Sequence, residues 1–253
     1  MRACYLDLDG TLLGAGGSLL RDGGGAFTTD GVRALGALAA AGVPVVIVSG
    51  RRAADVAEDA RVLGAAGWIA ELGALDCGYP VAEGQSVHDA IAATGVPDHL
   101  LALAGGALVP YAPWCDDRQG SHLLVGRAAP EVVAAAHDLS RGTLRLVDNG
   151  SVDAEGRRSY HLLPAAAGKG PAVARDAATR GVDLAASLAV GDSRADLELV
   201  GVLGAVALVA NSLTGDPTLA DDAPWITEGS YGAGVLEAVG RWLAGDPALD
   251  LIR

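Results

Sequence analysis

Short apolar runs alternate along this chain with segments whose apolar residues recur at helical spacing, and this alternation restricts the fold more than any other feature. Residues 3–6 and the β-branched run 43–48 are typical of parallel strands that are covered on both faces. Between them, apolar residues within 32–38 recur at helical spacing, and Gly42 ends the predicted helix. The pattern therefore predicts an open parallel α/β sheet.

The alternation stops near residue 75 and resumes near residue 165. Residues 77–113 contain several prolines and are predicted to be irregular. Downstream, the predicted elements are a strand, a helix and two successive strands, at residues 122–125, 130–139, 144–147 and 160–163. Strands that follow one another without a helix favour an antiparallel layer. We therefore predict a Rossmann-like core of residues 1–75 and 165–253, with an inserted α+β domain of residues 76–164.

Composition and charge exclude several classes of protein. Hydrophobic residues make up 51% of the chain, which is enough for a sizeable core. The formal net charge of −13 argues against nucleic acid or an anionic membrane as the main partner. The longest apolar stretches are broken by glycine or proline and fall short of the roughly 20 residues of a membrane span. We predict a soluble, cytoplasmic monomer or homodimer that binds a small molecule.

The segment 7–11 places two carboxylates directly after the first predicted strand. Side chains two residues apart on an extended chain point the same way, so Asp7 and Asp9 are expected to face one pocket, and Gly10 lets the chain turn. Two such carboxylates repel each other unless a hard cation such as Mg²⁺ neutralises them. One can then act as a nucleophile and the other as an acid and base. The alternative is a surface Asp-Gly turn.

Three further segments follow predicted strands or open predicted helices, where an open α/β sheet binds ligands. Ser49 and Gly50 offer a hydroxyl and a free N–H for a phosphate, although a plain helix cap is the alternative. Lys169 is the only lysine of the chain, and its ammonium group can hold a carboxylate and a phosphate together; a chance surface lysine is the alternative. Asp192 and Asp196 can complete an oxygen-ligand shell or simply cap a helix.

In this order, the segments resemble the haloacid dehalogenase (HAD) superfamily of phosphatases, most closely its subfamily IIB with a C2-type cap. The resemblance rests on segments 7–11, 48–51, 168–170 and 191–196, and on the turn 71–74. The segment 160–163, which leads to Lys169, is also similar to mannosyl-3-phosphoglycerate phosphatases. Two positions depart from the family pattern, because Leu72 and Ala195 stand where asparagine is common.

The resemblance implies a mechanism and a set of roles. Asp7 would attack phosphorus and form an aspartyl-phosphate, while Asp9 would protonate the leaving oxygen and then activate water. Mg²⁺ would lie between Asp7, the carbonyl of Asp9 and Asp192, supported by Asp196. Ser49, Gly50 and Lys169 would bind the phosphoryl group.

The predicted cap, residues 76–164, is expected to select the substrate. Its candidate substrate-binding residues are Arg118, Arg127, Arg157 and His161. Polar residues above a phosphate site suit a hydroxylated compound, so the predicted substrate is a phosphosugar or a sugar-phosphoglycerate. Two alternatives stay open: a phosphosugar mutase similar to phosphomannomutases, and a non-catalytic protein that binds phosphosugars.

Overall fold

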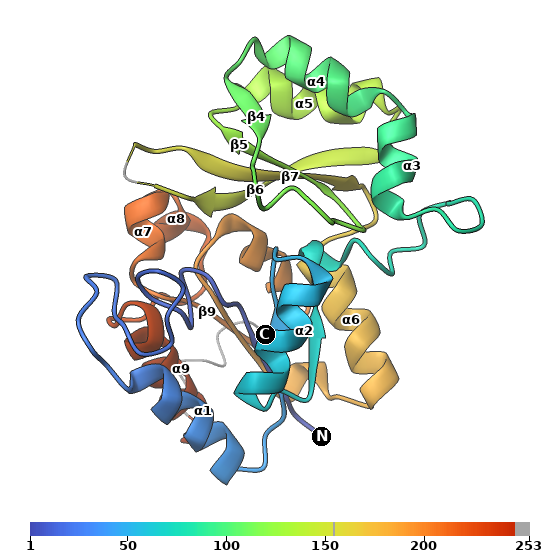
Figure 1. The fold of residues 1–253 in the computed structure, drawn as a ribbon. Helices are drawn as coiled ribbons and strands as arrows, with labels where there is room; N and C mark the ends of the chain where they lie inside the picture. The colour runs from blue at the N-terminus through green and yellow to red at the C-terminus, as the bar shows by residue number, and fades with distance from the viewer. Residues whose placement is uncertain (154, 246–253) are drawn as a thin grey trace.

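The protein contains two β-sheets, one above the other (Figure 1). This computed structural model describes residues 1–153 and 155–245. The lower sheet is formed by strands from both ends of the chain, and the upper sheet by strands between residues 108 and 164. The predicted α/β fold with a second, inserted layer is therefore confirmed. The domain limits at residues 76 and 165 stay a prediction, and residues 246–253 of the predicted core lie outside the described part.

The lower sheet is entirely parallel, with the strand order β3-β2-β1-β8-β9. Its strands, in chain order, are β1 (Cys4–Leu6), β2 (Val45–Val48), β3 (Gly67–Ile69), β8 (Leu188–Gly191) and β9 (Ala205–Leu208). The central strand β1 pairs with β2 on one side and β8 on the other. The carboxyl ends of these three strands therefore lie side by side at one edge of the sheet.

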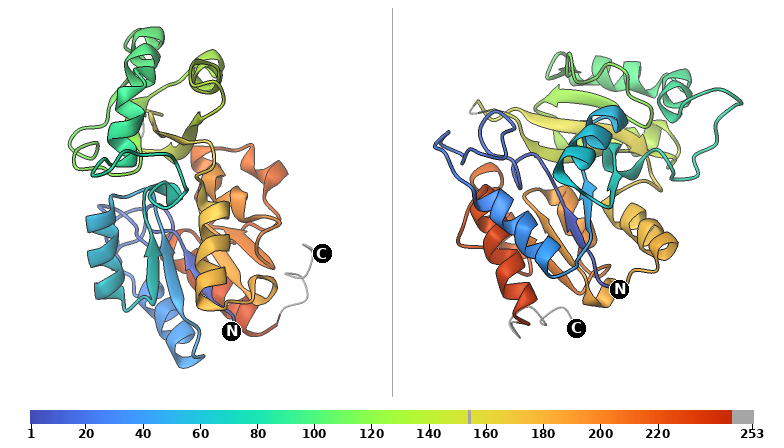
Figure 2. Two further views of the ribbon diagram at one scale, coloured as in Figure 1. Left: turned by 90° about the vertical axis from the view of Figure 1, so that its right-hand side faces the viewer. Right: turned by 60° about the horizontal axis from the view of Figure 1, so that its bottom comes forward.

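Helices cover both faces of the parallel sheet, as continuous apolar strands require. Cys4 and Leu6 point to a face covered by α1 (Asp30–Ala40), α2 (Ala53–Leu63) and α9 (Tyr231–Leu243). Ala3 and Tyr5 point to the opposite face, toward α6 (Lys169–Arg180) and the short turn η3 (Arg194–Leu199). Both faces are thus removed from water, and the loops at the strand ends are free to carry chemistry (Figure 2).

The upper sheet is antiparallel, with the order β4-β5-β7-β6. Its strands are β4 (Leu108–Pro110), β5 (His122–Gly126), β6 (Leu144–Ser151) and β7 (Arg158–Pro164). One face packs against α3 (Val87–Ala93), α4 (Val96–Ala104) and α5 (Pro130–Leu139) in a separate apolar core. The other face is turned toward the parallel sheet (Figure 1).

The prediction that residues 77–113 are irregular was wrong, because α3, α4 and β4 lie within them. The start of α3 has a local signal: Ser86 and Asp89 form a reciprocal capping box. Pro97 lies in the first turn of α4, where the missing N–H of a proline costs nothing. Proline therefore marked the start of a helix here, and not a loop.

The ends of three elements near the site are less regular. Lys169 is the first residue of α6, and Asp196 lies within a 3-10 turn, η3, and not at the start of an α-helix. Thr29 occupies the cap position of α1, but its side chain makes no capping hydrogen bond. Among the described residues, no helix combines the length and the apolar character that crossing a membrane would need.

Candidate active site

Four of the predicted site residues gather at the carboxyl edge of the parallel sheet. Asp7 follows β1, Ser49 follows β2, and Asp192 follows β8, so neighbouring strands bring them together. Lys169 enters from the first turn of α6. Gly50 continues the loop after Ser49, two residues before the cap of α2. The chain places these groups where open α/β sheets bind ligands.

Lys169 is the centre of this cluster. Its side chain is 1% exposed, and Nζ lies 2.6 Å from Asp196 Oδ1 and 3.1 Å from Asp7 Oδ1. Burial opposes the charge of the ammonium group, but the carboxylates of Asp196 and Asp7 outweigh it and raise the pKa of Lys169. The lone lysine is therefore a buried cation that links two carboxylates, and not a chance surface residue.

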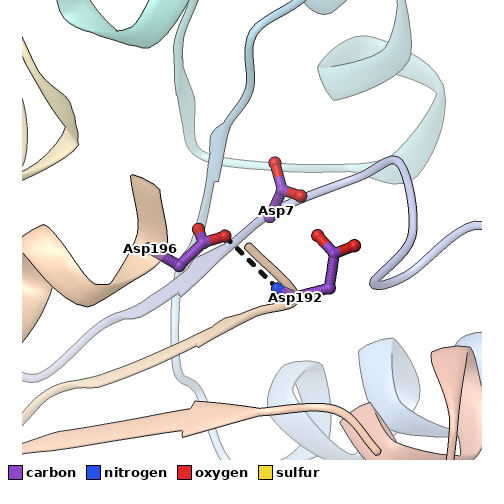
Figure 3. Close-up of side chains that lie close together, drawn as sticks. All are labelled: Asp7, Asp192 and Asp196. Atoms are coloured by element: carbon purple, nitrogen blue, oxygen red, sulfur yellow. Dashed lines mark hydrogen bonds between the residues drawn. The ribbon is translucent and has the colours of Figure 1, made fainter. Parts of the chain in front are cut away.

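Asp196 uses both carboxylate oxygens within the protein. Besides Lys169 at Oδ1, its Oδ2 accepts hydrogen bonds from the N–H of Asp192, the N–H of Ser193 and the hydroxyl of Ser193, at 2.8 to 3.2 Å. The bond to the N–H of Asp192 is drawn in Figure 3. A Cβ on Gly191 would lie 2.0 Å from Cγ of Asp196, so only glycine fits there. Asp196 thus fixes the loop that carries Asp192.

Asp7 and Asp192 are carboxylates whose ionisation the site disfavours. Burial, with a further contribution from Asp196 and Asp9, raises the pKa of Asp7 to about 6 despite the attraction of Lys169. Burial and the nearby carboxylates of Asp7 and Asp196 raise the pKa of Asp192 well above its ordinary value. The hydroxyl of Thr11 lies 3.4 Å from Asp7 and 3.3 Å from Asp192, which joins the two side chains.

These carboxylates fit a divalent cation. Asp7, Asp192 and Asp196 each offer one oxygen, and the three oxygens lie within 4.8 Å of one another (Figure 3). Carboxylate oxygens are the ligands that Mg²⁺ takes, and a cation would favour the ionised forms of Asp7 and Asp192, whose pKa values are raised by burial and by mutual repulsion. Because Asp196 is already hydrogen-bonded at both oxygens, Asp7 and Asp192 are the candidates for direct ligation.

The carboxylate of Asp9 pairs with Arg51, whereas the carboxylate of Asp7 contacts Lys169. The Asp9 side chain is about half exposed, and Nε and Nη2 of Arg51 donate to its two oxygens at 2.6 and 2.5 Å. Arg51 also binds Asp59 at 2.9 Å. The sequence motif indicated Arg51 only as a family feature, and the structure adds its contact with Asp9. The predicted role of the Asp9 carbonyl in metal binding stays a prediction.

A cavity of about 860 Å³ opens above the cluster. Asp7, Ser49 and Asp192 line it from the parallel sheet. The upper sheet and the segment between β4 and β5 line the cavity with polar and aromatic side chains, chiefly Tyr111, Trp114, Arg118, Asn149, Ser151, Ser159 and His161. The two layers therefore enclose a space in which a substrate can reach Asp7.

The predicted substrate residues of the cap have different surroundings. Arg118 and His161 line the cavity, whereas Arg127 and Arg157 are not among its lining residues. Arg127 donates to the carbonyls of Glu155 and Gly156, and Arg157 pairs with Asp153. Arg127, which follows β5, and Arg157 thus both bind residues of the β6–β7 connection. Substrate binding by Arg127 and Arg157 stays a prediction.

Arg118 and Glu71 join the two layers through a buried contact that the sequence did not show. Nη1 of Arg118 lies 3.5 Å from the fully buried Glu71 carboxylate, and Nη1 and Nη2 both donate to the carbonyl of Gly50 at 3.1 Å. Glu71 also accepts the N–H groups of residues 119–121 and the hydroxyl of Ser121. Both charges are satisfied within the protein, so this contact holds the upper layer against the Ser49–Gly50 loop.

The two departures from the family pattern lie in one place. Leu72 and Ala195 belong to a single buried apolar cluster with Leu163 and Ala167. Leu72 has φ +54°, in the left-handed region that asparagine tolerates better than leucine. Burial of the leucine side chain in this cluster offsets that strain, and neither substitution removes a carboxylate from the site.

Comparison with known proteins supports the HAD-like fold expected from the sequence motifs. No family model matches the chain. A phosphoglycolate phosphatase from Methanothermobacter thermautotrophicus is 28% identical over 244 residues, 96% of this chain and 99% of the relative. The sucrose-phosphatase of Synechocystis sp. PCC6803, solved with sucrose and phosphate, superposes with a TM-score of 0.65 at 20% identity, over 96% of this chain and 98% of that one. A HAD subclass IIB sugar phosphatase superposes with a TM-score of 0.61 at 13% identity, over 96% and 99%.

The chain therefore has the fold of HAD-like hydrolases, with a second antiparallel sheet that fits the cap of subclass IIB. The resemblance inferred from the motifs is confirmed at the level of the fold. The relative and the two solved structures described above carry the names of phosphatases.

Proposed function

We propose that this protein is a Mg²⁺-dependent phosphomonoester hydrolase that works through an aspartyl-phosphate on Asp7. The observation that carries the proposal is the buried contact of Lys169 with both Asp7 and Asp196, beside Asp192 and beneath the cavity. An ammonium group in this position keeps a nucleophilic carboxylate oriented and offsets the charge of an incoming phosphate. The phosphatase names of the relatives agree with this reaction.

In the proposed reaction, an oxygen of Asp7 attacks phosphorus while the bond from phosphorus to the leaving oxygen breaks. Asp9 gives a proton to that oxygen, so the alcohol leaves as a neutral molecule. The Asp9 carboxylate then takes a proton from water, whose oxygen attacks the phosphorus of the aspartyl-phosphate. The bond from phosphorus to the Asp7 oxygen breaks in this attack, so inorganic phosphate leaves and Asp7 is released as a carboxylate.

The remaining residues bind and orient the phosphoryl group. The hydroxyl of Ser49, the N–H of Gly50 and the ammonium of Lys169 are the proposed phosphate donors. Asp7, Asp192 and the carbonyl of Asp9 would hold Mg²⁺, which offsets negative charge on the phosphoryl group when it is bound. Asp196 supports this arrangement through its bonds to Lys169 and the Asp192 loop.

Asp9 has to change partners before it can act. Both of its oxygens are held by Arg51 in the structure. A carboxylate in a bidentate ion pair has no proton to give and no free oxygen to take one. We therefore propose that substrate binding separates this pair, so that Asp9 takes up a proton from solvent and turns to the leaving oxygen.

We propose a small hydroxylated compound as the source of the leaving group, such as a phosphosugar or sugar-phosphoglycerate, selected by residues 76–164. The cavity wall from the upper layer is mostly polar and neutral, and its one arginine, Arg118, is bound to Gly50 and Glu71. Such a wall suits hydroxyl groups. The cytoplasmic location and the monomeric or dimeric state stay predictions.

A phosphatase panel tests the proposed function. The purified protein is incubated with p-nitrophenyl phosphate, hexose phosphates, 3-phosphoglycerate and 2-phosphoglycolate, in Mg²⁺ or in EDTA, and free phosphate is measured. We expect Mg²⁺-dependent release that Asp7→Asn abolishes and that Asp138→Asn, at a side chain 82% exposed, retains. Transfer of phosphate to a second sugar without free phosphate would instead indicate a mutase. No turnover of any compound would favour a non-catalytic binding protein.

A further inference from the structure

His161 brings the upper sheet into contact with the proposed phosphate loop. It lies on the inner strand β7, is 1% exposed and lines the cavity. A Cβ built on Gly50 would lie 2.9 Å from His161 Nε2 and 2.7 Å from Asn149 Nδ2. Two polar nitrogens of the upper layer therefore converge at the residue that follows Ser49.

The hydrogen bonds of Ser121 determine which nitrogen of His161 carries the proton. The single hydroxyl proton of Ser121 goes to the Glu71 carboxylate at 2.9 Å, since an ionised acceptor makes the stronger bond. The Ser121 oxygen also lies 3.2 Å from Arg118 Nη1 and 3.2 Å from His161 Nδ1. Arg118 can only donate, and the hydroxyl proton is already used, so Nδ1 of His161 must donate as well.

His161 is neutral in this environment. Burial, together with the positive charges of Arg118 and Lys169, lowers the pKa of His161 well below its ordinary value. A neutral imidazole with its proton on Nδ1 has a lone pair on Nε2. Within the described part of the chain, Nε2 has no hydrogen-bond partner, so this lone pair is available to a molecule in the cavity.

Asn149 places a hydrogen-bond donor beside the Nε2 acceptor of His161. Its Nδ2 is a donor and also has no protein partner within the described residues. A hydroxyl group both donates and accepts, so it satisfies both nitrogens at once. A carboxylate can only accept, and it would face the lone pair of Nε2. The nearby Arg118 cannot offset this, because its guanidinium donates to Trp114, Gly50 and Ser121.

We propose that His161 and Asn149 form a subsite that recognises a hydroxyl group of the leaving alcohol close to the phosphate and disfavours a carboxylate in that place. His161 is the specificity-determining acceptor, and Ser121 and Glu71 are positioning residues that fix its tautomer. This inference rests on the proposed function. It predicts selection against 2-phosphoglycolate, the substrate class named for the relative at 28% identity.

Three small phosphates of matched size test the subsite: 2-hydroxyethyl phosphate, n-propyl phosphate and 2-phosphoglycolate. All three carry the phosphate on a CH₂ group. Beyond that CH₂, 2-hydroxyethyl phosphate has a hydroxymethyl group, n-propyl phosphate an ethyl group and 2-phosphoglycolate a carboxylate. We expect kcat/KM for the hydroxyl compound to exceed each of the others by at least about 10-fold. His161→Leu should bring these ratios close to one, and His161→Gln, which restores an acceptor, should recover part of the preference.

The matched control is His137→Leu, at a histidine that is 67% exposed on α5 of the same layer, and it should keep the ratios of the parent protein. A parent enzyme that prefers 2-phosphoglycolate, or equal losses on all three phosphates in His161→Leu, would overturn the subsite. If the parent protein also fails to hydrolyse p-nitrophenyl phosphate, the proposed phosphatase function fails instead.

The tautomer gives a test that needs no substrate. In the ¹⁵N-labelled parent protein at pH 7, two-bond ¹H–¹⁵N correlations should show His161 neutral with the proton on Nδ1, and Ser121→Ala should change that signal. The Nε2–H tautomer or an imidazolium in the parent protein would refute the proposal even if the variants at His161 do not fold.

Discussion

Replacing Asp7 by asparagine should abolish phosphate release and at the same time stabilise the metal-free protein. The loss of activity follows because an amide is a poor nucleophile. The gain in stability follows because the folded protein disfavours the ionised form of Asp7: its pKa is raised from 3.8 to about 6. Asparagine is nearly isosteric and carries no charge, so it removes the cost of that ionisation.

The size of the effect comes from the shift itself. One pKa unit corresponds to about 1.4 kcal/mol, so a shift of this size costs the folded state about 3 kcal/mol once Asp7 is fully ionised. The shift is a net value that already includes the attraction of Lys169. Below the pKa of the unfolded state, near pH 4, Asp7 is protonated in both states and the folded protein does not carry this cost. That contribution to stability is lost as the pH rises through the folded-state pKa of about 6.

The assay is chemical denaturation in EDTA from pH 4 to pH 8. Asp7→Asn and the parent protein should unfold with similar free energies near pH 4, and the variant should be more stable by up to about 3 kcal/mol at pH 7.5. Asp138→Asn serves as the control, because that carboxylate is on the surface. A variant that is no more stable than the parent at pH 7.5, or a difference that does not depend on pH, would refute the electrostatic argument.

Three further outcomes are expected. Lys169→Arg should lower kcat/KM for p-nitrophenyl phosphate at least about 100-fold, because a larger planar group must fit between Asp7 and Asp196 in a fully buried site; near-normal kinetics would contradict the assigned role. Millimolar Mg²⁺ should raise the melting temperature of the parent protein at pH 7.5, and Asp192→Asn should remove most of this increase; an equal increase in both would exclude Asp192 as a ligand. Glu71→Gln should lower the free energy of unfolding by about 3 kcal/mol, because Arg118 loses the charge that compensates its burial; a loss below about 0.5 kcal/mol, measured by denaturation, would contradict this.

Much of the parallel core could be predicted from the sequence, because its signals are local. Strands β1 and β2 are continuous apolar runs, and the carboxylates, Ser49 and Lys169 follow strands or open helices. The region 77–113 could not be interpreted in the same way. Its helices are short, its prolines lie at helix starts as well as in loops, and its core forms only when α3, α4 and α5 pack on the upper sheet.

The contacts of the cap residues likewise could not be predicted from the sequence. The sequence identified Arg118, Arg127 and Arg157 as equivalent cations, and it could not rank them, because each lies in a segment without a chemical motif. Their partners are set by the fold: Arg118 contacts Glu71 and Gly50 from the other layer, while the other two arginines bind residues of the β6–β7 connection. Distant contacts of this kind leave no spacing pattern in the chain.

The sequence by itself determined the kind of sheet, the order of the four motif segments and the residue types that carry charge at the strand ends. These properties depend on near neighbours along the chain. Tertiary structure alone decided that Asp9 pairs with Arg51 and that Ser121 orients the imidazole of His161. Those choices depend on which polar groups of separate segments are buried together, since a buried donor or acceptor must find its partner wherever packing places one.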